Sequence, residues 1–326
     1  MATTETAATD DVGPPPARRR RRWPARTVVV ALVLAGVAVT SWPVALTVVH
    51  NHQSNSAALG IDQDAARATP AGVAQELARA RRYNASLGSA TWRDPWRDRG
   101  TAGSADHRTY LGELSLFPAI GTLAIPRIRV HLPIYHDTST ASMAHGVGHF
   151  FGSSLPVGGP GTHAVLATHS GMSHATLFDR LPELRVGDRF FIRVYGEVLT
   201  YRVDRVIKVL PSELDQIARV PGQDHVTLVT CVPRLVNTYR LLVRGVRVPD
   251  TGSGTTPAAD PTATPGTDLA IQHWMIPRLA FSLIALGILA LIVIGWVRGD
   301  RRRRAERSLP AGQPPSGGDA NGPRRR

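Results

Sequence analysis

The chain contains a single cysteine, Cys231, near the end of an apolar run with the sequence TLVTC. Pro233 follows two residues later and predicts that this strand ends near the cysteine. A second β-type run begins around Tyr239, with Arg240 at its start. If the two runs pair as antiparallel strands, Cys231 and Arg240 become neighbours, with opposing Cα atoms ~5 Å apart.

This pair favours nucleophilic catalysis by a thiol. A guanidinium beside Cys231 would lower the pKa of the thiol or hold a developing oxyanion. A thiol nucleophile also needs a proton acceptor, and His169 is the preferred candidate because it ends a predicted strand just before Ser170 and Gly171. The alternatives are a small buried cysteine, an arginine in a surface ion pair and a surface or core histidine.

Four other histidines raise the alternative of a metal site: His145, His149, His163 and His174. Their spacing fits no specific ligand pattern, so we predict neither a metal nor another cofactor. The lone cysteine cannot form a disulfide within the chain.

Two uncharged apolar stretches, residues 27–49 and 279–297, are each long enough for a helix that crosses ~30 Å of hydrocarbon. Basic runs flank them at 18–22 and 301–304. Because cytoplasmic segments are enriched in Lys and Arg, both termini are predicted on the cytoplasmic side of the cell membrane and residues 50–270 on the extracellular side. The alternative for the first stretch is a cleaved signal peptide, but its apolar core exceeds the usual length of about 7–15 residues, which favours an uncleaved anchor.

The net charge of +13 is concentrated in the terminal basic runs, since residues 50–270 carry a net charge of only +3. Blocks of like charge at chain ends are typical of solvated tails. We therefore expect membrane lipid, and no nucleic acid, among the partners.

Between the apolar stretches, residues 71–87 have apolar side chains at helical spacing, and short β-type runs separated by turns follow from residue 111. GTLAIPRIRVHLPIY predicts strands that break at Pro126 and Pro133, and a hairpin is expected around Tyr195-Gly196. HATLFDRLPEL predicts a short helical turn. Many short strands at close spacing favour a mostly β barrel or sandwich.

The stretch TLVTCVPRLVNTYRLLVRG closely resembles the signature of sortases, the membrane-anchored cysteine transpeptidases of Gram-positive bacteria. Four further stretches agree in order: IPRIRVHLPIY, HGVGHFFGSSLPVGG, ATHSGM and LFDRLPELRVGDRF. The resemblance covers about residues 80–248. It implies a closed eight-stranded β-barrel with short helices.

The resemblance also implies roles for individual residues. Cys231 matches the nucleophile that forms the acyl thioester, and His169 matches the general acid/base. Arg240 matches the arginine that positions substrate and stabilises the oxyanion, and Thr230 matches a residue that lines the substrate site. Sortases cut sorting signals of LPxTG type after the threonine and pass the acyl group to an amine.

RDPWRDRG, residues 93–100, resembles the lid of class C sortases, which polymerise pilins and usually carry a second, C-terminal span. This likeness implies that Asp94 and Trp96 plug the active site. The chain departs from the class at Arg234-Leu235, at Tyr239 and around His169, where Gly-His-Arg-Gly is common. These departures surround the matched catalytic residues without removing them, so they bear on substrate preference more than on the chemistry.

The resulting expectation is a cytoplasmic tail (1–26), a transmembrane helix (27–49), an N-terminal helical and lid region (50–110), a catalytic barrel (111–250), a linker (251–276), a second transmembrane helix (277–297) and a basic cytoplasmic tail (298–326). The expected partners are LPxTG-bearing pilin subunits, with a pilin lysine as the amine acceptor. One alternative is a sortase that attaches surface proteins to a peptidoglycan precursor. Another is a membrane-tethered binding module, with 93–100 as an ordinary loop.

Overall fold

The computed structural model describes residues 25–88, 103–249, 272 and 274–307, and the structural statements below concern these residues. The helices are α1 (Ala25–Arg67), α2 (Pro70–Ser86), α3 (Ala105–Gly112), α4 (Thr140–His145) and α5 (Met275–Arg307), with short 3-10 helices η1 (Pro126–Ile128), η2 (Leu181–Glu183) and η3 (Leu214–Ile217). The strands are β1 (Gly121–Ile125), β2 (Val130–His136), β3 (Val147–His149), β4 (His163–Ala167), β5 (Arg189–Val194), β6 (Glu197–Val209), β7 (His225–Val232) and β8 (Tyr239–Arg247).

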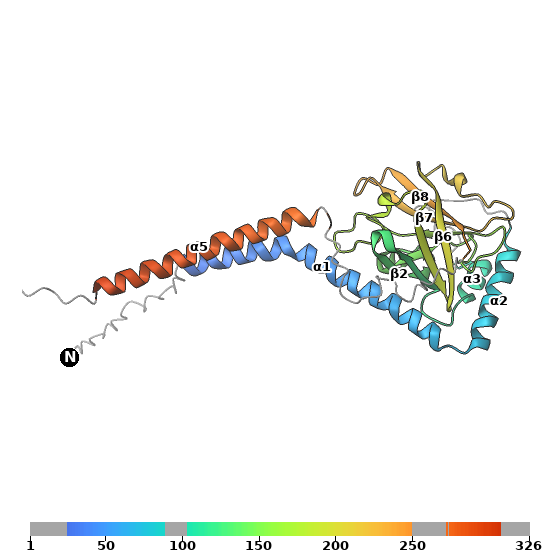
Figure 1. The fold of residues 1–326 in the computed structure, drawn as a ribbon, viewed down its shortest axis with the longest axis horizontal. Coiled ribbons are helices and arrows are strands. Elements are labelled where there is room, and N and C mark those ends of the chain that lie inside the picture. Colours follow the sequence, from blue (N-terminus) through green and yellow to red (C-terminus); the bar gives the residue numbers. More distant parts are fainter. Residues whose placement is uncertain (1–24, 89–102, 250–271, 273, 308–326) are drawn as a thin grey trace, which may run out of the picture. The chain divides into compact units, whose positions relative to one another are not determined.

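The eight strands close into a barrel in the order β1-β2-β3-β4-β7-β8-β6-β5 (Figure 1). Two neighbouring pairs, β2 with β3 and β4 with β7, run parallel, and the other pairs run antiparallel. Inside, the rings of Phe190 and Tyr201 stack with centroids 5.5 Å apart. Gly245 leaves room for them, since a Cβ there would lie 2.5 Å from the Phe190 ring. The predicted eight-stranded barrel is confirmed.

The local turn chemistry explains most strand boundaries. Tyr195 and Gly196 join β5 to β6 with φ of 50° and 87°, as a two-residue hairpin of type I′ requires, so this predicted hairpin is confirmed. η1 begins at Pro126, in agreement with the predicted break, and η2 supplies the predicted helical turn.

The predicted break at Pro133 is wrong, because this proline lies inside β2 opposite Thr122 of β1. β3 pairs with β2 only from Ile134 onward. The missing N–H of Pro133 therefore removes no ladder bond on the β3 side, and a strand tolerates proline at such a position.

The chain divides into two compact units, Ser41–Pro277 and the described residues of Met1–Thr40 with Arg278–Arg326. In the first unit, the later part of α1 is fixed to the barrel through Asp62. Its carboxylate accepts a hydrogen bond from the Thr122 hydroxyl (2.8 Å) and lies 3.2 Å from Nη1 of Arg193. The α2 helix is held by Asn84, whose amide bonds the carbonyl and the N–H of Leu155 at 2.9 and 2.7 Å.

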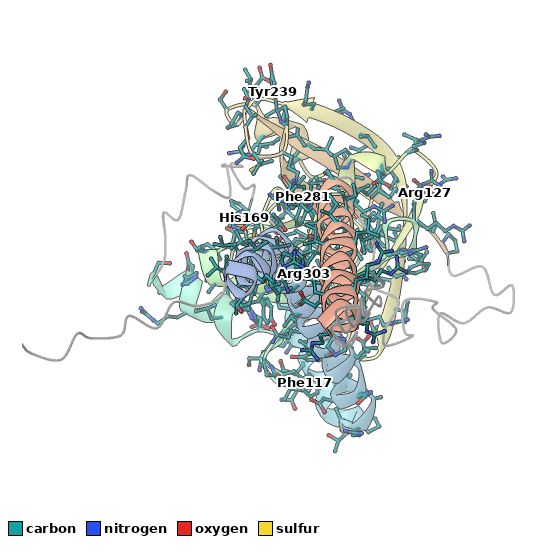
Figure 2. The ribbon with its side chains drawn as sticks, turned by 90° about the vertical axis from the view of Figure 1, so that its left-hand side faces the viewer. Phe117, Arg127, His169, Tyr239, Phe281 and Arg303 are labelled. Atoms are coloured by element: carbon teal, nitrogen blue, oxygen red, sulfur yellow. The ribbon has the colours of Figure 1, made fainter. Side chains whose placement is uncertain are left out.

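The second unit consists of helical segments from α1 and α5. Both helices are long and apolar enough to cross a membrane, and both extend beyond the predicted spans. Arg26 pairs with Asp300 at 2.6 Å. Large apolar side chains such as Leu32 and Phe281 are exposed, as expected for a surface that faces lipid; Figure 2 labels Phe281 on α5.

Two of the histidines considered as metal ligands are buried structural groups. His149 bonds the Tyr110 hydroxyl (3.0 Å) and the Ser154 carbonyl (2.8 Å), while the ring of His163 lies within hydrogen-bond distance of Ala218 and Thr227. Burial lowers the pKa of both imidazoles to about 4. Among the described residues, no group of three His, Cys, Asp or Glu side chains is arranged to hold a metal ion.

These buried imidazoles should make stability depend on pH. Because the unfolded chain binds their protons near pH 6.5 and the folded chain only near pH 4, the free energy of unfolding should fall as the pH drops between these values. The difference amounts to on the order of 3 kcal/mol for each histidine. Denaturant unfolding of the full chain in detergent at a series of pH values measures it.

The control for this prediction is His52, which is exposed. His163→Asn and His149→Asn should each flatten the dependence of unfolding free energy on pH, whereas His52→Asn should leave it unchanged. The same slope in all of these proteins would contradict the assignment.

Candidate active site

The single cysteine and the predicted arginine lie directly opposite each other in the β7–β8 ladder. Cys231 is the seventh residue of β7, and its register partner is Arg240, the second residue of β8. Both residues are buried, at 6% exposure each. The antiparallel pairing predicted from the sequence is confirmed, and it places the two side chains on the same face of the barrel wall.

The backbone between the two strands holds the guanidinium of Arg240. Its Nη1 donates to the carbonyls of Asn237 (3.0 Å) and Tyr239 (3.3 Å). Leu235 and Asn237 both have positive φ, 69° and 61°, which curls this connection tightly. These bonds hold the guanidinium at the β7–β8 connection, and the register opposite Cys231 puts it on the same face of the strand pair as the thiol. A positive charge there favours both a thiolate and a developing oxyanion.

The segment that carries His169 lies beside Cys231 because β4 runs parallel to β7. Just beyond β4, the Thr168 N–H donates to the Val229 carbonyl (3.2 Å), and the Ser170 hydroxyl donates to the Cys231 carbonyl. His169 is half-buried on this loop (Figure 2). Burial lowers its pKa, which favours the neutral imidazole that can accept a proton.

Thr230, the residue before Cys231 on β7, is fully buried. Its hydroxyl donates to the Thr168 carbonyl at 2.8 Å. The structure therefore gives Thr230 a part in holding the residue before His169, and its contact with substrate stays a prediction.

The turn after His169 packs against the β7–β8 connection at Gly171. This residue has a φ of +80°, and a Cβ there would lie 3.0 Å from both Cγ of Arg234 and the backbone nitrogen of Leu235. Glycine is required both for the left-handed backbone and for the close approach.

Asp179 joins the same two segments by hydrogen bonding. Its carboxylate accepts from the Gly171 N–H and lies 3.1 Å from Nε of Arg234. Arg234 also donates to the Met172 carbonyl (3.4 Å). The Asp179 side chain is only 4% exposed, and burial raises its pKa although the Gly171 N–H and Arg234 oppose this shift.

The sequence reasoning did not identify Asp179. It lies 55 positions from Arg234, and no local pattern links the two. Its signals in the sequence were its place in the stretch LFDRLPELRVGDRF and the departure from the class C pattern at Arg234, the residue with which it pairs. The predicted lid residues Asp94 and Trp96 lie outside the described residues.

Residues 123–248 match a family model described as "Sortase domain". The crystal structure of sortase C-1 from Actinomyces oris is similar at 47% sequence identity and a TM-score of 0.54, over 55% of this chain and 99% of that chain. The chain belongs to the sortase family.

Other solved sortases are also similar to this chain. Sortase C from Streptococcus pneumoniae is 33% identical with a TM-score of 0.55, over 60% of this chain and 97% of that one. Sortase A from Corynebacterium diphtheriae is 38% identical with a TM-score of 0.54, over 69% and 96%. Class C sortases are thus among the structural neighbours.

A curated relative is sortase A of Streptococcus agalactiae serotype III (strain NEM316), 29% identical over 117 residues, which are 35% of this chain and 47% of that protein. The chain spans about half the length of the curated relatives it matches.

In this sortase, the Asp179–Arg234 pair should stabilise the fold at the end of the barrel that carries Cys231. Asp179→Asn removes the buried charge and should lower the free energy of unfolding by about 1–3 kcal/mol. A double-mutant cycle with Arg234→Gln should give a coupling energy of about 1 kcal/mol or more. Denaturant unfolding of the full chain in detergent measures both.

Glu183 provides a matched control, since it pairs with Arg180 at 2.7 Å but its side chain is 49% exposed. Glu183→Gln should cost no more than about 0.5 kcal/mol. If Glu183→Gln lowers the free energy of unfolding as much as Asp179→Asn does, the buried Asp179–Arg234 pair contributes no more than an exposed ion pair.

Proposed function

We propose that this sortase is a class C cysteine transpeptidase, which cleaves LPxTG-type sorting signals after the threonine and transfers the acyl group to an amine. The observation that carries the proposal is the register pair of Cys231 and Arg240 with the His169 segment bonded alongside. Family membership and class C structural neighbours support it.

The first half-reaction forms a thioester. His169 accepts the proton of the Cys231 thiol, and the sulfur attacks the carbonyl carbon of the substrate threonine. Negative charge develops on the carbonyl oxygen beside the guanidinium of Arg240. The carbon–nitrogen bond to glycine then breaks, and His169 donates its proton to the departing amine.

The second half-reaction consumes the thioester. An acceptor amine attacks the acyl carbon, His169 takes a proton from that amine, and the Cys231 thiolate departs and is reprotonated. The new bond is an amide, and the enzyme returns to its starting state. The acceptor we favour is a pilin lysine, because the similar pneumococcal sortase C is described in terms of pilin substrate specificity.

The same proposal covers the arrangement in the membrane. Residues 27–49 and 277–297 lie within the two apolar helices and would span the cell membrane, with the tails 1–26 and 298–326 in the cytoplasm. The helical and lid region (50–110), the barrel (111–250) and the linker (251–276) would then be extracellular, where sorting signals are presented.

Asp94 and Trp96 are proposed as a self-inhibitory lid, with the acid directed to the cationic site and the aromatic to the substrate groove. The similar C. diphtheriae sortase A has been solved as a lid mutant, so that relative possesses a lid.

Cys231→Ala should abolish transpeptidation of an LPxTG peptide and prevent capture of the acyl enzyme, both measured by mass spectrometry and product formation. Arg240→Lys keeps the charge but loses the planar fork, and should lower kcat/KM roughly 10²–10³-fold. Arg202→Gln, at an exposed position of β6, is the control and should retain activity. Unchanged turnover in Cys231→Ala would overturn the thiol mechanism, and absence of turnover in the parent protein would favour the membrane-tethered binding module.

The acceptor is distinguished in the same assay. A lysine-containing pilin peptide should be joined to the acyl group more efficiently than a peptidoglycan-precursor amine. The reverse preference would select the anchoring alternative while leaving the thioester chemistry intact.

Removal of the proposed lid should expose the thiol. Asp94→Ala combined with Trp96→Ala should raise the rate at which a thiol reagent modifies Cys231. The measured rate belongs to this residue because the chain has one cysteine. Trp92→Ala, just upstream, is the control and should react at the parent rate. Equal rates in all three proteins would indicate an ordinary loop.

A further inference from the structure

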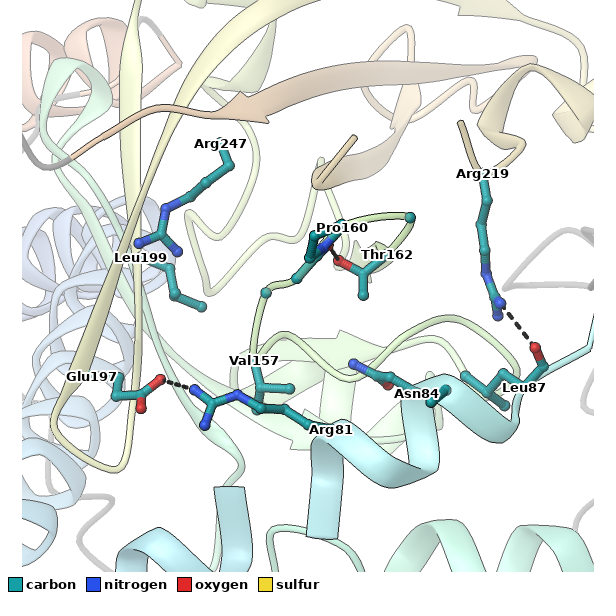
Figure 3. A pocket seen from close by; sticks show the side chains of 14 residues that line it. Arg81, Asn84, Leu87, Val157, Pro160, Thr162, Glu197, Leu199, Arg219 and Arg247 are labelled. Carbon is teal, nitrogen blue, oxygen red and sulfur yellow. Dashed lines mark hydrogen bonds and ion pairs between the residues drawn. The ribbon is translucent and has the colours of Figure 1, made fainter. Parts of the chain in front are cut away.

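A cavity of about 740 Å³ lies in the barrel unit away from the candidate active site (Figure 3). It is bordered by the end of α2, the glycine-rich loop 158–161, the start of β6 and the last residue of β8. Arg247 at the cavity and Arg240 at the active site are seven residues apart on β8, which corresponds to roughly 23 Å along a strand. The cavity is therefore a separate feature of the molecule.

The charged side chains that line the cavity are three arginines and one glutamate: Arg81, Arg219, Arg247 and Glu197. Arg81 and Glu197 pair with each other at 2.6 Å. Figure 3 shows Arg219 and Arg247 at opposite ends of the cavity, with Pro160 and Thr162 between them. The lining thus carries an excess of positive charge.

Arg219 is incompletely satisfied. Its Nη1 donates to the Leu87 carbonyl at 3.1 Å, whereas its Nε and Nη2 are buried and have no hydrogen-bond partner among the described residues. Burial lowers the pKa of this guanidinium. Buried cationic donors without acceptors are unfavourable, so this arrangement favours an anion supplied by a ligand.

The glycine loop keeps side chains out of the space beside Arg247. Gly158, Gly159 and Gly161 have φ of 67°, 127° and 76°. A Cβ on Gly158 would lie 3.5 Å from Nη1 of Arg247 and 2.9 Å from a carboxylate oxygen of Asp224. That carboxylate is engaged by the loop, since it accepts the Gly159 N–H at 3.1 Å.

We propose that this cavity binds a phosphate-bearing ligand, with the Nε and Nη2 donors of Arg219 as its cationic contact. A phosphate monoester carries a charge of about −1.5 to −2 near pH 7 and offers more acceptor oxygens than a monocarboxylate, so it can accept from both unpartnered donors of Arg219 in a lining where arginines outnumber carboxylates. The guanidinium fork binds phosphate oxygens in pairs. The volume lies within the range of about 300–1,000 Å³ usual for small-molecule sites, so it admits an organic group as well as the phosphate.

The phosphate could come from a soluble phosphomonoester or from a lipid headgroup, and calorimetric titration of the full chain in detergent distinguishes them. Glycerol 3-phosphate and dihexanoyl phosphatidic acid are the two probes. We expect saturable binding of at least one of them, with the tighter probe identifying the source. Arg219→Gln should weaken binding at least tenfold, and Arg202→Gln, which removes the same charge at an exposed position, should not.

Malonate tests the choice of phosphate over carboxylate. Binding of malonate as tight as that of glycerol 3-phosphate, equal affinity in Arg219→Gln, or no saturable binding of either phosphate probe would each overturn the proposal. Cys231→Ala should bind the phosphate probes like the parent, so failure of this inference is distinguishable from failure of the proposed transpeptidase function.

Discussion

The register of β7 against β8 is the constraint on which the candidate active site depends. Side chains alternate along a strand with a period of two, so a slip of one residue would send Cys231 and Arg240 to opposite faces. Eight register pairs fix this alignment, from His225 with Val246 to Val232 with Tyr239. β6 fixes β8 from its other side, which makes a slip costly along two ladders at once.

The strand pair alone does not supply a proton acceptor. His169 is brought to the thiol by the parallel pairing of β4 with β7, and short hydrogen-bonded links extend that pairing past the end of β4. Gly171, Asp179 and Arg234 then hold the following turn against the β7–β8 connection. Rigid strands thus position loops, and the loops carry the chemistry.

The same two strands also connect the candidate active site with the cavity that Arg219 and Arg247 line. The β7–β8 pair has Cys231 and Arg240 at one end and Arg247 at the other. Closure of the barrel pairs both edges of each described strand, so the loops that line the cavity and the candidate active site lie at opposite ends of this strand pair. Two sites of different chemistry can therefore share one scaffold without sharing residues.

Many of the secondary-structure elements, and the placement of Cys231 beside Arg240, could be predicted from local sequence. Composition determined the apolar helices, alternation and turn residues determined most strands, and Cys231 could be placed beside Arg240 because their strands are consecutive in the chain. Tertiary structure decided the rest. Pro133 is tolerated because β3 does not begin until Ile134, the Asp179–Arg234 pair spans 55 positions, and the cationic cavity gathers distant segments. Such contacts depend on how the barrel closes, and no neighbouring residue encodes them.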